Sequence, residues 1–156
     1  MTPSKNTDYK IQRECSRQWR SVVAAMAQEL SLASRHSNGH DFGHRIGQRY
    51  ATQSALPVCS NLDELQAAIS ARWQSMDWGW IDLDDAGGRL RIVHHGAGNG
   101  DLLASALGDD TKVWVPSFLS GVYQQWLASL GASDELRVRQ VSPVDEFGTL
   151  ELELSL

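Results

Sequence analysis

Residues 73–94 read WQSMDWGWIDLDDAGGRLRIVH, and within this stretch the spacing of the apolar side chains changes from a helical to a strand period. Upstream, over residues 62–76, apolar side chains recur every three or four positions, which predicts a helix with one buried face. Residues 78–84 and 89–94 instead alternate on either side of the turn residues 85–88, which predicts a β-hairpin. We therefore expect a helix that leads directly into an antiparallel pair of strands.

Two further helices are expected upstream of this junction. The first covers about residues 9–32, where apolar positions repeat at helical spacing until the Asn-Gly pair at residues 38–39 breaks the pattern. The second covers about residues 40–52. Within it Gly43 and Gly47 share one stripe, and glycine on a helix face suits the close approach of another backbone.

The ends of the remaining helices carry recognisable capping residues. The helix over residues 62–76 follows Asn61, an expected N-cap, and Glu64 three residues later completes a capping-box arrangement. Downstream of the hairpin, a helix is expected over residues 116–130, because proline suits the first helical position and Gly131 ends the apolar stripe.

Two strands close the chain, over residues 136–141 and 149–156. The second reads TLELELSL, so its leucines alternate with polar side chains and one face should be buried while the other is wet, as in an antiparallel sheet. The order ααα-ββ-α-ββ predicts an α+β fold in which helices pack on a four-stranded antiparallel sheet. We expect a single domain over residues 9–156, preceded by a mobile polar segment over residues 1–8.

The composition argues against several classes of protein. The chain has 156 residues and a formal net charge of −5, without a run of lysine or arginine, so we expect neither nucleic-acid binding nor a polybasic membrane patch. Its longest apolar run, residues 22–27, is too short for membrane insertion. The first residues lack the apolar core of a signal peptide, so we expect a cytoplasmic protein, with the periplasm as the alternative. Cys15 and Cys59 match no zinc or redox spacing and are expected to be free thiols.

Three histidines raise the question of a metal site. His36, His40 and His44 recur every four residues, which on one helix would bring three imidazoles together. The Asn-Gly pair at residues 38–39 interrupts that helix, and zinc sites usually have a third or fourth ligand that is missing here. We therefore expect solvated histidines and no metal.

A glycine-rich segment raises the question of a cofactor. Residues 94–101, HHGAGNGD, follow a strand and precede a possible short helix over residues 102–107, as a nucleotide-binding or methyltransferase loop would. The glycine spacing is GxGxG instead of GxGxxG, and His94 stands where a methyltransferase would carry an acidic residue. A surface loop is favoured, and no cofactor is expected.

Catalytic residues are equally difficult to identify. Asp77, Asp82, Asp84 and Asp85 lie close to several tryptophans, and a pair of them could serve a glycosidase. Clustered acids beside a turn are more often a solvated edge, and the chain has no GxSxG nucleophile motif. We expect no catalytic residue.

The tryptophans can be interpreted in two ways. On a strand over residues 78–84, Trp78, Trp80 and Asp82 share one face while Ile81 and Leu83 share the other. Because both faces are largely apolar, we expect helices to cover one and a partner subunit to cover the other. A row of exposed aromatic rings that stacks on sugars is the functional alternative, but packing is favoured.

Four groups of residues carry a family resemblance. They are Arg45-Ile46-Gly47, Trp78-Gly79-Trp80 followed by Ile81-Asp82-Leu83, Arg91-Ile92-Val93-His94, and Trp114-Val115-Pro116 leading into Gly121-Val122-Tyr123-Gln124-Gln125-Trp126. In this order and spacing they resemble the D-subunit family of bacterial cellulose synthase, also called cellulose synthase operon protein D. The resemblance extends from about residue 41 to residue 130.

The resemblance implies a small, non-catalytic accessory subunit of the cellulose-synthesising machinery. It implies a ring-like homo-octamer, a tetramer of dimers, with internal passages for glucan, and an N-terminal segment that contacts the chain. In this sequence the contacting residues would be Lys5, Asn6, Thr7 and Asp8. The expected partners are further copies of the chain, the other synthase subunits and the β-1,4-glucan.

Three alternatives stay open at this point. Within the family, the ring is a scaffold that aligns synthase complexes and does not touch glucan. Outside it, the chain is a stand-alone carbohydrate-binding module, or a small enzyme such as a methyltransferase that uses the loop from Gly96 to Gly100.

Overall fold

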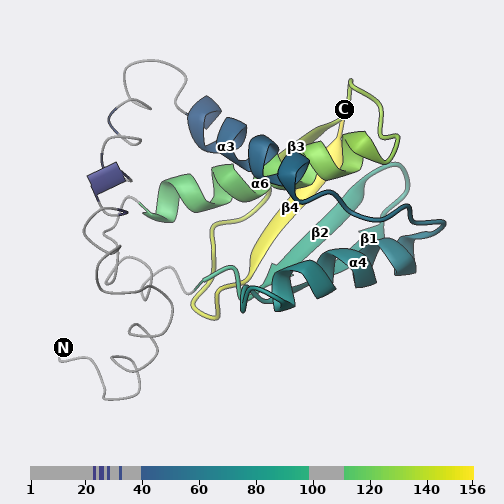
Figure 1. Ribbon diagram of the computed structural model, residues 1–156, viewed down its shortest axis with the longest axis horizontal. Helices are drawn as coiled ribbons and strands as arrows, with labels where there is room; N and C mark the ends of the chain where they lie inside the picture. Colours follow the sequence, from purple (N-terminus) through teal and green to yellow (C-terminus); the bar gives the residue numbers. More distant parts are fainter. Residues whose placement is uncertain (1–22, 24, 27, 29–31, 33–39, 99–110) are drawn as a thin grey trace.

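The computed structural model describes residues 23, 25–26, 28, 32, 40–98 and 111–156 (Figure 1). It confirms the predicted α+β fold, with helices before and between the strands in the expected order. The elements are α3 His40–Gln53, α4 Leu62–Gln74, β1 Trp80–Asp85, β2 Leu90–His95, α6 Thr111–Ser129, β3 Arg137–Gln140 and β4 Leu150–Ser155.

The four strands form one antiparallel sheet in the order β1-β2-β4-β3. The predicted hairpin is present, with Trp80 opposite His95 and Asp85 opposite Leu90. In β4 the leucines are buried and the alternating glutamates and serine are half-buried, as the TLELELSL pattern predicts. These leucines belong to the core of the single chain, so they are not available as a contact between subunits.

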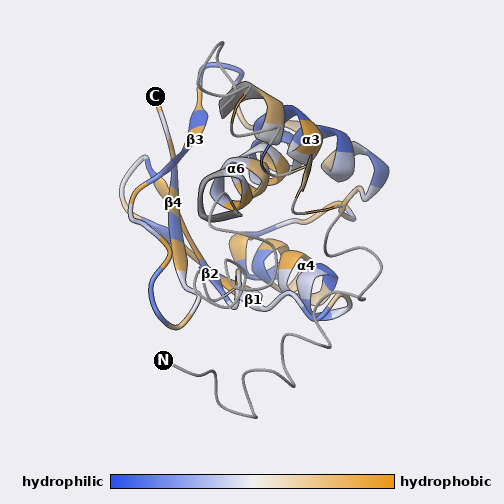
Figure 2. Cartoon of the chain, turned by 90° about the vertical axis from the view of Figure 1, so that its left-hand side faces the viewer, coloured by the Kyte–Doolittle hydropathy of each residue, from blue (hydrophilic) through white to orange (hydrophobic). Residues whose placement is uncertain are grey.

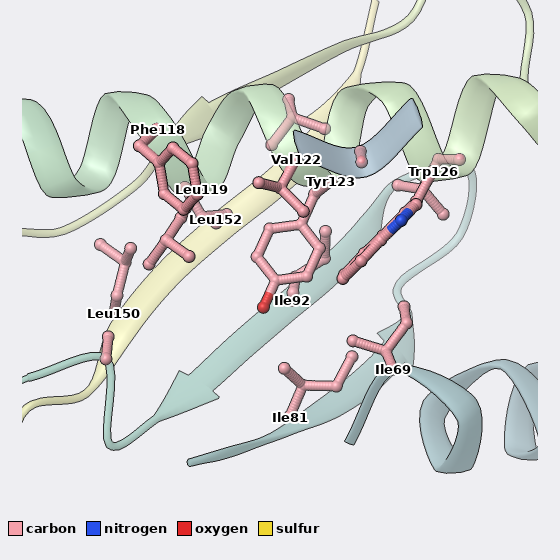
Figure 3. Close-up of a cluster of buried hydrophobic side chains, with 14 of the residues drawn as sticks. Ile69, Ile81, Ile92, Phe118, Leu119, Val122, Tyr123, Trp126, Leu150 and Leu152 are labelled. Atoms are coloured by element: carbon pink, nitrogen blue, oxygen red, sulfur yellow. The ribbon is translucent and has the colours of Figure 1, made fainter. Parts of the chain in front are cut away.

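The described helices α3, α4 and α6 all lie on one side of the sheet, and none of them covers its other face, which we call the open face (Figures 1 and 2). Helix α6 packs on β3 and β4, α4 packs on β1, and α3 crosses the outer side of α6. Figure 3 shows the resulting core, where Tyr123 and Trp126 of α6 meet Ile69 of α4 and Ile81 and Ile92 of the hairpin. The second face of the sheet is therefore not covered by any helix of the described chain.

Glycines set the distance between α3 and α6. A Cβ on Gly47 would lie 2.0 Å from the carbonyl oxygen of Phe118, and one on Gly121 would lie 2.0 Å from that of His44. The prediction that the Gly43 and Gly47 stripe receives another backbone is confirmed, and Gly121 is its counterpart on α6. The apolar side chains Phe42 and Ile46 are instead 40% and 37% exposed, because the glycine stripe occupies the interface.

Side chains of two helices bind the outer edges of the sheet. At β1, the Ser70 hydroxyl accepts a hydrogen bond from the Ile81 amide at 3.1 Å. One turn earlier on α4, Gln66 Oε1 accepts from the Leu83 amide at 2.7 Å. At β3, Gln124 of α6 accepts from the Val138 amide at 2.8 Å. These contacts occupy backbone groups that an exposed edge strand would offer to another chain.

Several predicted boundaries differ from the structure. Helix α6 begins at Thr111, so Pro116 lies inside it and not at its first position, and the helix lacks one backbone N–H there. The capping of α4 is confirmed, since Asn61 Oδ1 accepts from the Glu64 amide at 2.8 Å. The helix predicted over residues 9–32 is described only at residues 23, 25–26, 28 and 32, which are helical. The possible helix over residues 102–107 lies outside the described residues.

Candidate functional site

The chain reverses direction sharply just before β1, at Gly79. This glycine has a φ of +76°, and a Cβ there would lie 1.7 Å from the carbonyl oxygen of His95. Because L-residues rarely adopt this conformation, the position is specific for glycine. The turn interrupts the strand alternation, so Trp78 does not share a face with Trp80, contrary to the prediction.

Trp73 and Trp78 pack inside the chain, as predicted. Trp73 is fully buried, and its ring lies 5.3 Å from that of Trp78 in an edge-to-face arrangement. Trp78 stacks on Phe118 at 5.6 Å and donates its indole N–H to the Ala97 carbonyl at 3.0 Å. The Nε1 atom of Trp73 has no hydrogen-bond partner among the described residues, so Trp73 is held by ring packing alone. Aromatic rings in such edge-to-face and stacked contacts are typical of a core.

Trp80 does not join this core and is 48% exposed on the open sheet face. Its ring stacks on His95, its cross-strand partner, with the centroids 5.2 Å apart and the planes 21° from parallel. His95 Nε2 in turn lies 2.8 Å from Asp82 Oδ2. We call these three side chains the Trp80 corner. Alternation along β1 turns Trp80 away from the helices, so it is the face of Ile81 that the helices cover. The predicted packing of the Trp80 face against a partner subunit stays a prediction.

Directly behind this corner, His94 points into the core and is fully buried. Its Nε2 lies 2.8 Å from the Trp78 carbonyl oxygen, and its Nδ1 lies 2.6 Å from the Tyr123 hydroxyl. A carbonyl can only accept, so Nε2 carries the proton and Nδ1 accepts from Tyr123. Burial lowers the pKa of His94 from an ordinary 6.5 to about 4. The hydrogen bond to Trp78 opposes this shift in pKa and the nearby His95 adds to it, but both effects are smaller than that of burial. Burial also raises the pKa of Tyr123.

Both groups of this pair are therefore neutral near pH 7. A neutral histidine held between a carbonyl and a phenol anchors the hairpin to α6, and its second nitrogen is not free to exchange a proton with a substrate. We assign His94 and Tyr123 a structural role.

Most of the other side chains on the open face are charged, and the half-buried Val93 lies among them. One row across the sheet alternates in sign, with neighbours paired in register: Asp84, Arg91, Glu153 and Arg139. Arg91 also contacts Glu151 at 2.7 Å, and Arg89 lies 3.8 Å from Glu153. Pairs as exposed as these contribute about 0–1 kcal/mol each. They keep the face polar and solvated.

The remaining sequence candidates are distributed as follows. Asp77, Asp84 and Asp85 are exposed, and Asp82, also exposed, contacts His95. Gly96 has a φ of +72°, and a Cβ on it would lie 3.1 Å from the Gly79 Cα, so it serves the turn.

Other candidates are not tested by the structure. Residues 99 and 100 of the glycine loop, His36, and the proposed glucan contacts Lys5, Asn6, Thr7 and Asp8 lie outside the described residues. Among the described residues there is no group of three metal-ligating side chains, and none of their helices is long and apolar enough to cross a membrane.

A shallow hollow on the helical side of the molecule lacks the features of a ligand-binding site. It lies along α3 and is lined by Arg45, Gln48, Arg49, Thr52 and Gln53. All five side chains come from one helix and the hollow is wide open, so no second element contributes a group that could fix a ligand.

His95 is the functional candidate that sequence reasoning missed. The observed register has Asp85 opposite Leu90, so the turn spans residues 86–89 and residue 95 lies opposite residue 80. The turn predicted at residues 85–88 is one residue earlier and would have paired residue 80 with residue 93. Such a register follows only once the turn is fixed, and a one-residue slip would reverse every side chain.

Comparison with known proteins gives one match. The family model for the D subunit of cellulose synthase matches residues 5–154, which is nearly the whole length of the chain. No curated protein matches it.

Proposed function

The chain belongs to the D-subunit family of cellulose synthase, and from this membership we propose that it is a non-catalytic accessory subunit whose ring-like oligomer guides nascent β-1,4-glucan chains for export and crystallisation. The observation that carries the proposal is the family match over residues 5–154. The oligomer is a homo-octamer, a tetramer of dimers, that works with the other synthase subunits on the cytoplasmic side of the inner membrane.

The distribution of exposed apolar side chains supports an oligomer. A subunit of an octamer needs at least two different contact surfaces, because a single two-fold patch closes at the dimer. The outer stripe of α3 carries the exposed side chains of Phe42 and Ile46, and Val141 is 58% exposed beside the sheet. The sheet edges are less suitable for assembly, because Ser70, Gln66 and Gln124 already bind their backbone groups.

The guiding role requires weak contacts. A β-1,4-glucan has hydroxyls along its edges and apolar C–H faces, and a strong site would trap the polymer. We assign the contacts inside the ring to the N-terminal residues Lys5, Asn6, Thr7 and Asp8.

Deletion of residues 1–8 tests this assignment. We expect the truncated chain to keep the mass of the octamer in size-exclusion chromatography with light scattering, because the described fold begins later in the chain. Cellulose yield and crystallinity in cells should fall.

Two results would contradict the proposal at different points. An untruncated chain that elutes as a monomer would exclude the ring. Unchanged cellulose with an intact oligomer would exclude the N-terminal guide and favour a scaffold that aligns synthase complexes.

A further inference from the structure

We propose that the Trp80 corner is a second glucan contact, a shallow platform on the open sheet face where the free side of the indole stacks on a glucose ring. The choice of a β-1,4-glucan as ligand rests on the proposed function. The site itself is argued from the geometry of Trp80, His95 and Asp82.

The indole of Trp80 is exposed and also held in place. Among the tryptophans that the structure describes, it is the one with an exposed side chain, at 48%. His95 covers one side of the ring at 5.2 Å, and the 2.8 Å contact with Asp82 fixes the imidazole in turn. A ring that is already oriented loses little conformational freedom on binding.

The chemistry of the corner matches a β-linked glucose. The apolar C–H face of the sugar can lie on the indole, and the hydroxyls at its edge can reach a carboxylate. Asp82 is well exposed and uses Oδ2 for His95, so it has further lone pairs for a hydroxyl donor. The charged row beyond it, with Asp84 and Arg91, offers more polar groups to the next sugars.

The exposure of both Trp80 and Asp82 at the surface suits contact with an extended polymer. A single stacked ring and a few exposed hydrogen bonds give weak binding, which lets a chain slide. A second copy of the subunit is the competing occupant. Strands β1, β2 and β4 have six residues each and β3 has four. At about 3.4 Å per residue and about 4.8 Å between strands, they outline roughly 360 Å². A stable protein interface covers about 800 Å² on each partner, so the sheet face alone is too small.

The test measures cellohexaose binding to the full-length oligomer by saturation-transfer NMR, with α-linked maltohexaose as the control sugar. We expect Trp80→Ala to weaken cellohexaose binding at least ten-fold and Trp80→Phe to retain part of it. Phe147→Ala is the matched control, because Phe147 is an aromatic residue with 79% exposure outside the corner, and it should bind as the parent does. Repeating the titration after deletion of residues 1–8 separates this site from an N-terminal one.

His95 is a positioning residue in this proposal. His95→Phe keeps an aromatic ring under the indole and should retain most binding, whereas His95→Ala releases the indole and should lose it. A purely structural role would affect the unfolding midpoint of both variants without this difference in binding.

The proposal is overturned if Trp80→Ala binds cellohexaose as the parent does, or if it reduces the mass of the oligomer, which would assign the face to a subunit contact. Cellohexaose binding that is lost on deletion of residues 1–8 and unaffected by Trp80→Ala would overturn the platform alone and leave the N-terminal guide in place. A monomeric parent chain would instead contradict the proposed function.

Discussion

At the scale of single residues, two adjacent histidines lie on opposite faces of β2 and have different roles. His94 lies in the core between Trp78 and Tyr123, and its neighbour His95 lies on the open face under Trp80. The difference follows from the strand period of two. Burial then decides the charge state, because an imidazolium without water around it is costly.

The buried histidine predicts a pH-dependent stability. The pKa of His94 is about 4 in the folded chain against an ordinary 6.5, so between these values the unfolded chain binds more protons. The free energy of unfolding should therefore fall as the pH drops from about 6.5 to about 4, by about 3 kcal/mol in total from this residue. Urea titrations across this range measure the slope.

A His94→Gln variant provides the control for that slope. Its amide can still donate to Trp78 and accept from Tyr123, but it does not titrate. An equally steep loss of stability in this variant would assign the effect to other groups.

At the scale of elements, helix side chains perform two tasks that helix periodicity alone does not indicate. The glycines of α3 and α6 bring two backbones into contact, and the amides and hydroxyls of α4 and α6 bind the sheet edges. Ser70 and Gln66 are four residues apart on α4, so they lie on one face of the helix and reach alternate residues of β1.

The close crossing of α3 and α6 predicts that alanine substitutions at two glycines of α3 differ in their effect on stability. Gly47→Ala would place a methyl group 2.0 Å from the Phe118 carbonyl oxygen, so the helices must separate, at a cost of about 3 kcal/mol. Gly43→Ala meets chiefly the Ser117 side chain, at 3.0 Å, and gains helix propensity, so it should be nearly neutral. Thermal and urea unfolding of the two variants measure the difference, and equal effects would contradict the close crossing.

At the scale of the whole molecule, the chain has one closed and one open side. The described helices cover one sheet face (Figure 2). The other face carries the alternating charges and the Trp80 corner. Exposed apolar side chains remain on the outer stripe of α3, at Phe42 and Ile46. A ring of eight subunits would bury some of this surface and leave room for glucan on the rest.

If the chain forms the proposed oligomer, its unfolding midpoint should depend on protein concentration. If subunits bind one another only when folded, dilution below the dissociation constant lowers the unfolding midpoint by mass action. Calorimetry from high to low concentration should therefore show a falling Tm, with Phe42→Ser reducing the dependence. A Tm independent of concentration would indicate a stable monomer.

Local sequence patterns were enough to predict the class of fold and most of its elements. The change of period at residues 73–94, the alternation of TLELELSL and the Gly43–Gly47 stripe each depend on neighbours along one chain, so local patterns were sufficient. The family was also recognisable, from short motifs in a fixed order.

The burial of each tryptophan and the contacts of the two histidines follow from tertiary packing and could not be predicted from local patterns. Trp78 and Trp80 are two residues apart, yet the positive φ of Gly79 sends one into the core and leaves the other on the surface. The pairing of Trp80 with His95 depends on strand register, and the contact of His94 with Tyr123 joins a strand to a helix 29 residues away. Such contacts arise when distant segments pack, and local periodicity contains no information about them.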